Sequence, residues 1–274
     1  MRWYIRSWGD ADAPLALLLH GAGASGHSFE TLAPLLAHRF RVVAPDLPGH
    51  GGTRGGDLSL PGMVAGLEGL LDVLGGKLAL LVAHSAGAAL ALHLARTRVR
   101  VPVVGINPSF ERPGAAPAFV TRAVGAVLTQ PVVTGALAAL ARHTPLIDGL
   151  LDSTGSQVPQ ASRATYRALH GDPDRLGAVL RMFQSWSGED LLPVLRSTAG
   201  PVLLLTGGAD RWIAPDRVRA LGALIPGGRV ETLAQLGHLA HEEQPERIAA
   251  RVLEFVESAQ RGGHDDPPSA AGAA

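Results

Sequence analysis

Cysteine is absent from all 274 residues of the chain. Without it the chain cannot form a disulfide bond, use a thiolate as a nucleophile, or hold zinc through sulfur ligands. Whatever chemistry the chain performs has to rest on other side chains.

Net charge is also absent, because 24 Lys and Arg residues balance 24 Asp and Glu residues. A chain without a basic excess gives no electrostatic reason to expect nucleic acid as a partner. Residues 1–14, MRWYIRSWGDADAP, lack the apolar core of a signal peptide. We therefore expect a soluble protein of the cytoplasm.

One uncharged run, residues 123–141 (AVGAVLTQPVVTGALAALA), approaches the length of a membrane span. It contains Thr, Gln, several small residues and a proline in its middle, so its hydropathy is modest. The run therefore predicts a pair of apolar helices within a cap and not a transmembrane segment.

Short apolar runs alternate with segments of helical spacing along most of the chain. Strands are predicted at residues 15–19, 41–45, 77–83, 101–106, 201–206 and 229–233, and helices at 29–38, 59–74, 86–96, 215–225 and 245–259. This alternation indicates an α/β fold with a mostly parallel central sheet and helices on both faces. The strand segments show little polar alternation, which is typical of strands covered on both sides.

The alternation stops between about residues 110 and 195, a stretch rich in Ala, Leu, Val and Pro with helical spacing. We expect residues 110–195 to be a helical cap inserted into an α/β core made of residues 1–109 and 196–259. Its apolar stripe should lie above the carboxyl ends of the strands, because helices already cover the faces of the sheet. Residues 260–274 are rich in Gly, Pro, Ala and Asp, and predict a disordered tail.

A serine stands between small residues just after the third predicted strand, in Ala83-His84-Ser85-Ala86-Gly87. This is the pattern of a nucleophile elbow, Gly-x-Ser-x-Gly, with Ala83 in place of the first glycine. Small residues are needed because such a turn brings the backbones of strand and helix close together. The N-terminus of the following helix directs its free amides at the serine. Ser85 is therefore the candidate nucleophile.

A turn after the first predicted strand, His20-Gly21-Ala22-Gly23, predicts the second half of an oxyanion hole. The donors would be the backbone N–H groups of Ala22 and of Ala86, the residue after the nucleophile. His20 itself is expected to have a structural role.

Two further residues follow predicted strands in the chain order that this type of hydrolase uses. Asp210 lies just beyond strand 201–206, and His238 follows strand 229–233. His238 would take the proton of Ser85, and Asp210 would hold the imidazole in one tautomer and stabilise its charged form. Ser85, Asp210 and His238 thus form the predicted catalytic triad, which needs no metal and no organic cofactor.

Other acidic and histidine side chains compete for these roles. Asp46 also follows a strand, but a turn or cap role suits a carboxylate there better. His241 is the nearest rival for the base, and its acidic surroundings suggest a capping role before the last helix. Four more histidines are interpreted as surface, turn or cap residues: His27, His84, His143 and His170.

These motifs resemble those of the α/β-hydrolase superfamily over nearly the whole chain. Within it, the chain is similar to the BchO-like magnesium chelatase accessory proteins, which are encoded with bacteriochlorophyll biosynthesis genes. The segments that carry this closer resemblance are 20–25 (HGAGAS), 44–51 (APDLPGHG), 84–89 (HSAGAA), 153–156 (STGS) with a helix around Tyr166, 182–186 (MFQSW) and 237–243 (GHLAHEE).

The resemblance implies an α/β-hydrolase fold and cleavage of an ester, amide or similar acyl bond through a covalent acyl-serine. Haloalkane dehalogenase and epoxide hydrolase chemistry would require an aspartate at the elbow, so Ser85 argues against both. The expected ligand is a small apolar acyl compound or a tetrapyrrole, with magnesium chelatase subunits as candidate partners. Two alternatives stay open: a non-catalytic accessory that binds porphyrin or the chelatase, and a general esterase unrelated to pigment synthesis.

Overall fold

Seven strands form one sheet in the computed structural model, which describes residues 1–97, 101–110, 124–186 and 191–262. They are β1 (Ile5–Trp8), β2 (Leu15–Leu19), β3 (Arg41–Pro45), β4 (Leu78–His84), β5 (Val103–Ile106), β6 (Val202–Gly207) and β7 (Arg229–Leu233). Their order is β1-β3-β2-β4-β5-β6-β7, with β1 antiparallel to β3 and the other neighbours parallel. The carboxyl ends of the parallel strands therefore meet at one edge, where ligands bind in folds of this kind.

The six strands predicted from the sequence are all present, each with ends within two residues of the expected ones. The sequence does not predict β1, a short edge strand that alternates exposed and half-buried residues and includes Arg6 and Ser7. An edge strand of four residues buries too little apolar surface to leave a clear pattern.

Helices connect the strands and cover the sheet. They are η1 (Gly26–Phe29), α1 (Ala33–Leu36), α2 (Leu60–Leu74), α3 (Gly87–Thr97), α5 (Pro131–His143), α6 (Leu146–Ser153), α7 (Gln160–His170), α8 (Pro173–Ser185), α9 (Leu191–Ser197), α10 (Pro215–Gly222), α11 (Ala240–Glu243) and α12 (Pro245–Gly262). The single helix predicted over residues 29–38 is wrong, because η1 ends at Phe29 and the separate short helix α1 covers only Ala33–Leu36. Pro34 explains the break, since proline is tolerated in a first turn, where it stands in α1, but not in a helix interior.

Side chains of β2 alternate between two apolar cores, one on each face of the sheet. Leu15, Leu17 and Leu19 lie in the core covered by α2, α3, α9 and α10. Ala16 and Leu18 lie in the core covered by α1 and α12. Both faces are therefore buried, as the lack of polar alternation predicts.

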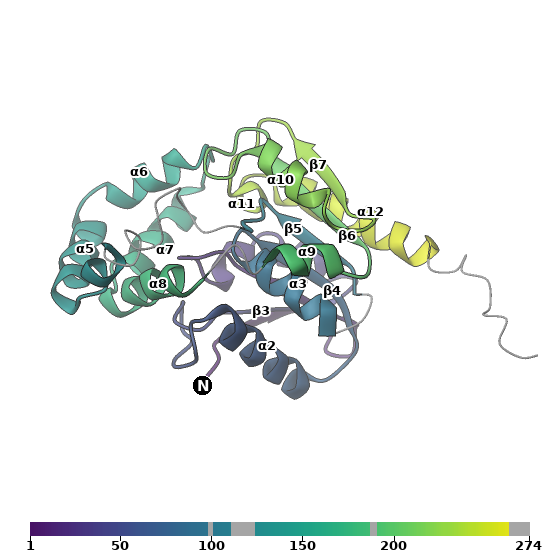
Figure 1. Ribbon diagram of the computed structural model, residues 1–274, viewed down its shortest axis with the longest axis horizontal. Helices are drawn as coiled ribbons and strands as arrows, with labels where there is room; N and C mark the ends of the chain where they lie inside the picture. Colours follow the sequence, from purple (N-terminus) through teal and green to yellow (C-terminus); the bar gives the residue numbers. More distant parts are fainter. Residues whose placement is uncertain (98–100, 111–123, 187–190, 263–274) are drawn as a thin grey trace, which may run out of the picture.

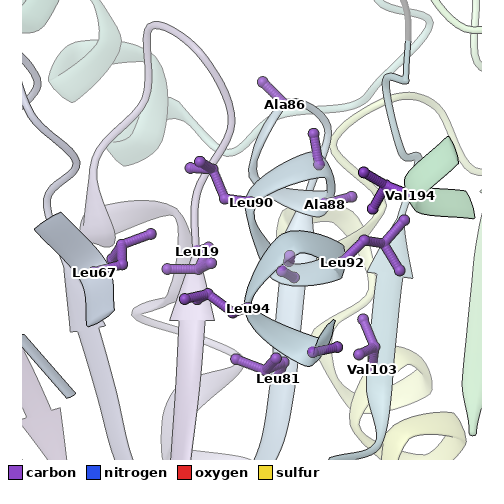
Figure 2. Packing of buried hydrophobic residues seen from close by; sticks show 14 of the residues in the cluster. Leu19, Leu67, Leu81, Ala86, Ala88, Leu90, Leu92, Leu94, Val103 and Val194 are labelled. Atoms are coloured by element: carbon purple, nitrogen blue, oxygen red, sulfur yellow. The ribbon is translucent and has the colours of Figure 1, made fainter. Parts of the chain in front are cut away.

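Helix α3 lies directly over the strands that lead to the elbow (Figure 2). Leu90 and Leu94 point to the side of α3 where Leu19 lies, while Leu92 points to the opposite side, toward Val194 of α9. Buried alanines lie beside these leucines at positions 88, 89, 91 and 95. Small side chains let the helix lie close to the sheet, which fixes the start of α3 against the end of β4.

Helices α5 to α8 follow β5 and lie together beyond one end of the sheet (Figure 1). α5 packs against α8, and α7 packs against η1 at the edge of the core. These helices lie within the residues expected to form the cap, 110–195, and the expected boundary falls inside α9. The buried residues of α9 belong to the core over the sheet, so a boundary before Leu191 fits the packing better.

The uncharged run at residues 123–141 is interrupted in the structure. Residues 124–128 are helical, and α5 begins separately at Pro131, after Gln130 in an extended conformation. Within the described ranges, no helix combines the length and the apolar character needed to cross a membrane.

At the C-terminal end of the chain, α12 continues past residue 260, where the disordered tail was expected to start. The rest of the expected tail, residues 263–274, lies outside the described part.

Gly87 is the position in the elbow where a side chain is least tolerable. A Cβ there would lie 2.4 Å from the carbonyl oxygen of Leu19 and 2.7 Å from that of His20. We expect Gly87→Ala to lower the free energy of unfolding by about 2 kcal/mol or more, because backbone has to move.

The matched control for this change is Gly135→Ala in α5, where an added Cβ meets no neighbouring atom within 4 Å. It should be neutral or should stabilise by up to about 1 kcal/mol, because alanine is the better helix former. Urea unfolding measures both variants, and equal stability of the two would contradict the prediction.

Candidate active site

Ser85 occupies the tight turn between β4 and α3, with a backbone φ of 49°. A non-glycine residue in this left-handed region costs about 1 kcal/mol or more, so the surrounding contacts have to hold it there. The Ser85 N–H donates to the carbonyl of Ile106 at 3.0 Å, and its own carbonyl accepts the N–H of Ser109 at 3.1 Å. These bonds tie both sides of the turn to the end of β5 and the loop after it.

The structure brings together the three residues predicted as a triad from distant parts of the chain. The Nε2 atom of His238 lies 3.1 Å from Ser85 Oγ, and its Nδ1 atom lies 2.8 Å from Asp210 Oδ2. The second carboxylate oxygen of Asp210 accepts the N–H groups of Trp212 and Ile213 at 2.8 and 2.9 Å. Asp210 is therefore fixed on both oxygens and aimed at the imidazole.

This arrangement selects one tautomer of His238. An ionised carboxylate can only accept hydrogen bonds, so the proton of the imidazole sits on Nδ1 and is donated to Asp210. Nε2 is left as an acceptor for the hydroxyl of Ser85. A base that is unprotonated at Nε2 and faces a serine hydroxyl is the arrangement needed to activate that serine.

The turn after β2 lies directly against the elbow. A Cβ on Gly21 would be 3.0 Å from Ser85 Cβ and 2.8 Å from His84 Nδ1, so a glycine is required at this close approach. The next residue, Ala22, and the residue after the nucleophile, Ala86, both line the same cavity as Ser85.

A cavity of about 810 Å³ opens over Ser85 between the strand ends and the cap helices. Most of its lining is apolar, and the charged side chains in its described lining are Arg211 and Arg217. The larger apolar side chains that line it are Phe110, Leu150, Leu151, Tyr166, Phe183, Trp212, Ile213, Val218, Leu221 and Leu239. The volume and lining suit an apolar ligand of drug-like size or larger.

Asn107, at the end of β5, is a site residue that the sequence reasoning missed. Its side-chain amide donates to the carbonyls of Gly237 and His238 at 2.9 and 2.7 Å, and its oxygen accepts the N–H of Gly207 at 2.6 Å. It thereby joins the loops that carry the acid and the base. The sequence feature that could have identified Asn107 is its position as a polar residue directly after a buried parallel strand.

His84 and His241 are buried beside His238 and are not surface or capping residues, so those two interpretations are wrong. The Nε2–H of His84 donates to the carbonyl of His238 at 2.9 Å. The ring of His84 lies 4.8 Å from the ring of His238 and 4.5 Å from that of His241, centre to centre. The three rings form one continuous buried group because the loop after β7 folds back over β4.

The other histidines have structural or peripheral positions. His20 is fully buried and its Nε2 accepts the N–H of Leu47 at 2.9 Å, which fits the expected structural role. His27 is buried against the ring of Tyr166, contrary to a surface position. His170 is partly buried and His143 is exposed.

Asp46 makes the bonds expected of a turn residue and none to His238. One oxygen accepts the Gly26 N–H at 2.7 Å and the Arg6 guanidinium at 3.0 Å, and the other accepts the Gly52 N–H at 2.6 Å. The carboxylate therefore holds the loop after β3.

Burial lowers the pKa of several histidines around the site. The pKa falls to about 4 for His27 and His50 and to about 3 for His241, and it lies well below the ordinary value for His20 and His84. In each case loss of hydration disfavours the charged ring more than any neighbouring charge does. These rings are neutral at neutral pH.

Glu242 has the opposite shift. Burial raises the pKa of its carboxyl to about 7, although the hydrogen bond from the Tyr166 hydroxyl, at 2.7 Å, favours the charged form. This bond joins α11 to α7.

Among the described residues, no group of three or more His, Asp or Glu side chains is placed to hold a metal ion.

Comparison with known proteins finds relatives over nearly the whole chain. The model of the alpha/beta hydrolase family matches residues 16–251. The magnesium-chelatase 30 kDa subunit of Rhodobacter capsulatus is 37% identical over 266 residues, covering 93% of this chain and 91% of that protein. A pimeloyl-[acyl-carrier protein] methyl ester esterase of Stenotrophomonas maltophilia is 29% identical, covering 89% and 93%. An alpha/beta hydrolase fold protein of Burkholderia ambifaria has a TM-score of 0.76 at 27% identity, covering 92% and 94%.

The buried histidines predict that the protein loses stability in mild acid. Each ring is neutral when folded, whereas an unfolded chain protonates histidine near pH 6.5, so unfolding takes up protons between about pH 4 and 6.5. Glu242 opposes this by one proton, because it stays protonated in the folded state up to about pH 7. At about pH 5.5 the net uptake should be 3 to 4 protons, which lowers stability by about 5 kcal/mol per pH unit.

Urea unfolding at closely spaced pH values between about 5 and 7.5 gives the slope near pH 5.5, and the slope should flatten above about pH 7. His50→Gln should make the slope shallower by about one proton, whereas His143→Gln, at an exposed position, should leave it unchanged. Equal stability across this pH range would show that the rings are not held neutral.

Proposed function

The chain belongs to the alpha/beta hydrolase family, and we propose that it is a serine hydrolase that cleaves an ester or similar acyl bond of an apolar substrate. The family and the observed sheet confirm the fold expected from the sequence. The observation that carries the proposal is the continuous set of contacts from Ser85 through His238 to Asp210.

In the proposed reaction, His238 takes the hydroxyl proton of Ser85 at Nε2 while Oγ forms a bond to the acyl carbon. The electron pair of the carbonyl double bond moves onto its oxygen. When that pair returns, the alcohol departs with the proton from His238 and leaves an acyl-serine. A water molecule then repeats the sequence, activated by His238, and releases the acid and the free serine.

The backbone N–H groups of Ala22 and Ala86 are the proposed donors to the negative oxygen that forms in this step. Both residues lie beside Ser85 in the cavity, one in the turn after β2 and one at the start of α3. The start of α3 adds the positive end of its helix dipole. Removing one donor of this kind from other hydrolases typically slows turnover by about 100-fold or more.

The wider role that we propose is that of an accessory factor for magnesium chelatase in bacteriochlorophyll biosynthesis. The support is the 37% identity with a protein named as the 30 kDa subunit of that enzyme, over nearly the full length of both. In this role the chain would act on an apolar acyl or tetrapyrrole-like ligand and contact a chelatase subunit.

A second candidate function is binding of a tetrapyrrole without hydrolysis. The favouring observation is the cavity, because its apolar walls suit a flat macrocycle and Arg211 and Arg217 could meet carboxylate side chains on it. A third candidate function is that of a general esterase unrelated to pigment synthesis. The 29% identity with the methyl ester esterase of Stenotrophomonas maltophilia supports it.

We predict that a fluorophosphonate probe labels Ser85 stoichiometrically. Ser85→Ala should abolish labelling, and His238→Gln should slow it by a factor of about 1000 or more, because the base is lost. Ser197→Ala, at an exposed serine on α9, is the matched control and should react like the unmodified protein. Mass spectrometry of the labelled peptide identifies the site.

The same set of proteins distinguishes the candidates. Folded protein that takes up no probe, yet whose Ser85→Ala form binds a dicarboxylic porphyrin below about 10 μM, would favour the binding function. Labelling at Ser85 with hydrolysis of short-chain esters and no porphyrin binding would favour a general esterase.

We also predict opposite effects of two aspartates. Asp210→Asn should keep the fold but lower turnover by a factor of about 10,000, because the amide would favour the wrong tautomer of His238. Asp46→Asn should instead lower the free energy of unfolding by about 1–3 kcal/mol through its lost turn bonds, with turnover largely kept. Turnover and urea unfolding measured on both variants test this, and the reverse pattern would reassign the acid.

A further inference from the structure

A four-residue turn at the end of α6, Ser153-Thr154-Gly155-Ser156, contacts both loops that carry the proposed acid and base. We call residues 153–156 the cap turn. Thr154 and Ser156 are buried, with 1% and 6% of their surfaces exposed. Thr154 also lines the cavity over Ser85, whereas Ser156 does not, so the burial of Ser156 against the loops requires another explanation.

One carbonyl of the cap turn joins the two loops directly. The carbonyl oxygen of Thr154 accepts the N–H of Arg211 at 3.2 Å and the N–H of His238 at 3.3 Å. Arg211 is the residue after Asp210, so this oxygen links the backbone of the acid loop to that of the base itself.

A side chain of the cap turn holds the other side of the base. The hydroxyl of Ser156 accepts the N–H of Leu239, the residue after His238, at 2.8 Å. The backbone of His238 is therefore bonded on both sides to residues of the cap turn. The shape of the turn is set from within, because Thr154 Oγ1 accepts the Ser156 N–H at 3.1 Å and donates to the carbonyl of Leu151.

The contact between the cap turn and the loops is so close that it needs glycine. Gly155 has a φ of 81°, and a Cβ on it would lie 2.1 Å from the carbonyl oxygen of Ala209. A Cβ on Gly237 would lie 2.4 Å from the carbonyl carbon of Gly155. Backbone therefore packs on backbone along the whole contact.

Side chains on either side extend the attachment. Glu243 accepts the N–H of Gly237 at 2.8 Å with one oxygen and the N–H of Gln157 at 3.1 Å with the other. The indole N–H of Trp212 donates to Ser153 Oγ at 3.0 Å. The cap turn itself is thus bonded to the two residues just after Asp210 and to His238 and Leu239.

We propose that the cap turn is a positioning element that sets the geometry between Asp210 and His238. The sheet fixes the ends of β6 and β7 but not the loops beyond them, and a catalytic side chain has to be held within about 0.5 Å. Asn107 restrains these loops from the side of the core, and the cap turn restrains them from the side of the cap. The position of the cap and the alignment of the base are therefore coupled. This inference rests on the proposed function.

The test uses Ser156→Ala and Thr154→Val, which remove single hydroxyls, and Thr154→Ser, which keeps the hydroxyl. Gly155→Ala is avoided, because its added Cβ would clash with the backbone of Ala209 and could prevent folding. We expect Ser156→Ala and Thr154→Val to lower kcat for a short aryl ester by about tenfold or more, with KM changed less than twofold, since misplaced catalytic groups slow the reaction itself. Thr154→Ser should restore kcat, and Ser197→Ala should match the unmodified protein.

If the cap turn contributed only to folding, these variants would have a lower melting temperature but an unchanged pH dependence of kcat. We expect the midpoint of the pH profile to move in Ser156→Ala, because the bond between Asp210 and His238 is altered. Unchanged kcat and pH profile in both hydroxyl-deleting variants would overturn the proposal, and so would a loss confined to KM.

Titration of the His238 ring by NMR separates this inference from the proposed function. If the unmodified protein fails to react at Ser85, the proposed function fails, yet a displaced titration of His238 in Ser156→Ala would still support positioning by the cap turn. An identical titration in Ser156→Ala and the unmodified protein would overturn the positioning role whether or not the protein hydrolyses esters.

Discussion

The hydrogen bond between His238 and Asp210 is the interaction on which the arrangement of the site depends. It joins loops that leave two neighbouring parallel strands, and a bond of 2.8 Å tolerates little relative movement of those loops. Two sets of contacts restrain them: the Asn107 side chain from the core and the carbonyl of Thr154 from the cap. Once the imidazole is held by Asp210, its free nitrogen faces Ser85, whose own position is fixed by the turn into α3.

The environment of this bond is buried and rich in neutral rings. His84 and His241 lie next to His238 without carrying charge, because burial keeps their pKa low. A neutral surrounding avoids repulsion when His238 gains a proton in the proposed reaction. The cap closes this region with apolar side chains and contributes Tyr166, bonded to Glu242, as one of its attachments.

Most of the fold could be predicted from the sequence because strands covered on both sides leave unbroken apolar runs. The runs at 15–19 and 41–45 coincide with β2 and β3. Edge strand β1 was missed because four half-exposed residues leave no such run. The helix predicted over 29–38 was wrong because the apolar spacing runs on through Pro34, whereas a proline favours the start of a helix, and α1 begins at Ala33. In both cases the pattern of apolar side chains along the sequence did not indicate where the strand or helix lies.

By itself, the sequence determined which residues follow the strands: small residues around Ser85, Asp210 beyond β6 and His238 beyond β7. Parallel strands place such residues at one edge of a sheet, so their meeting follows from chain order alone. Only the tertiary structure decided what surrounds them. Three features depend on contacts between segments roughly 60 to 150 residues apart: the burial of His84 and His241, the bonds of Asn107, and the attachment of the cap turn to both loops. No local pattern encodes a contact at that separation.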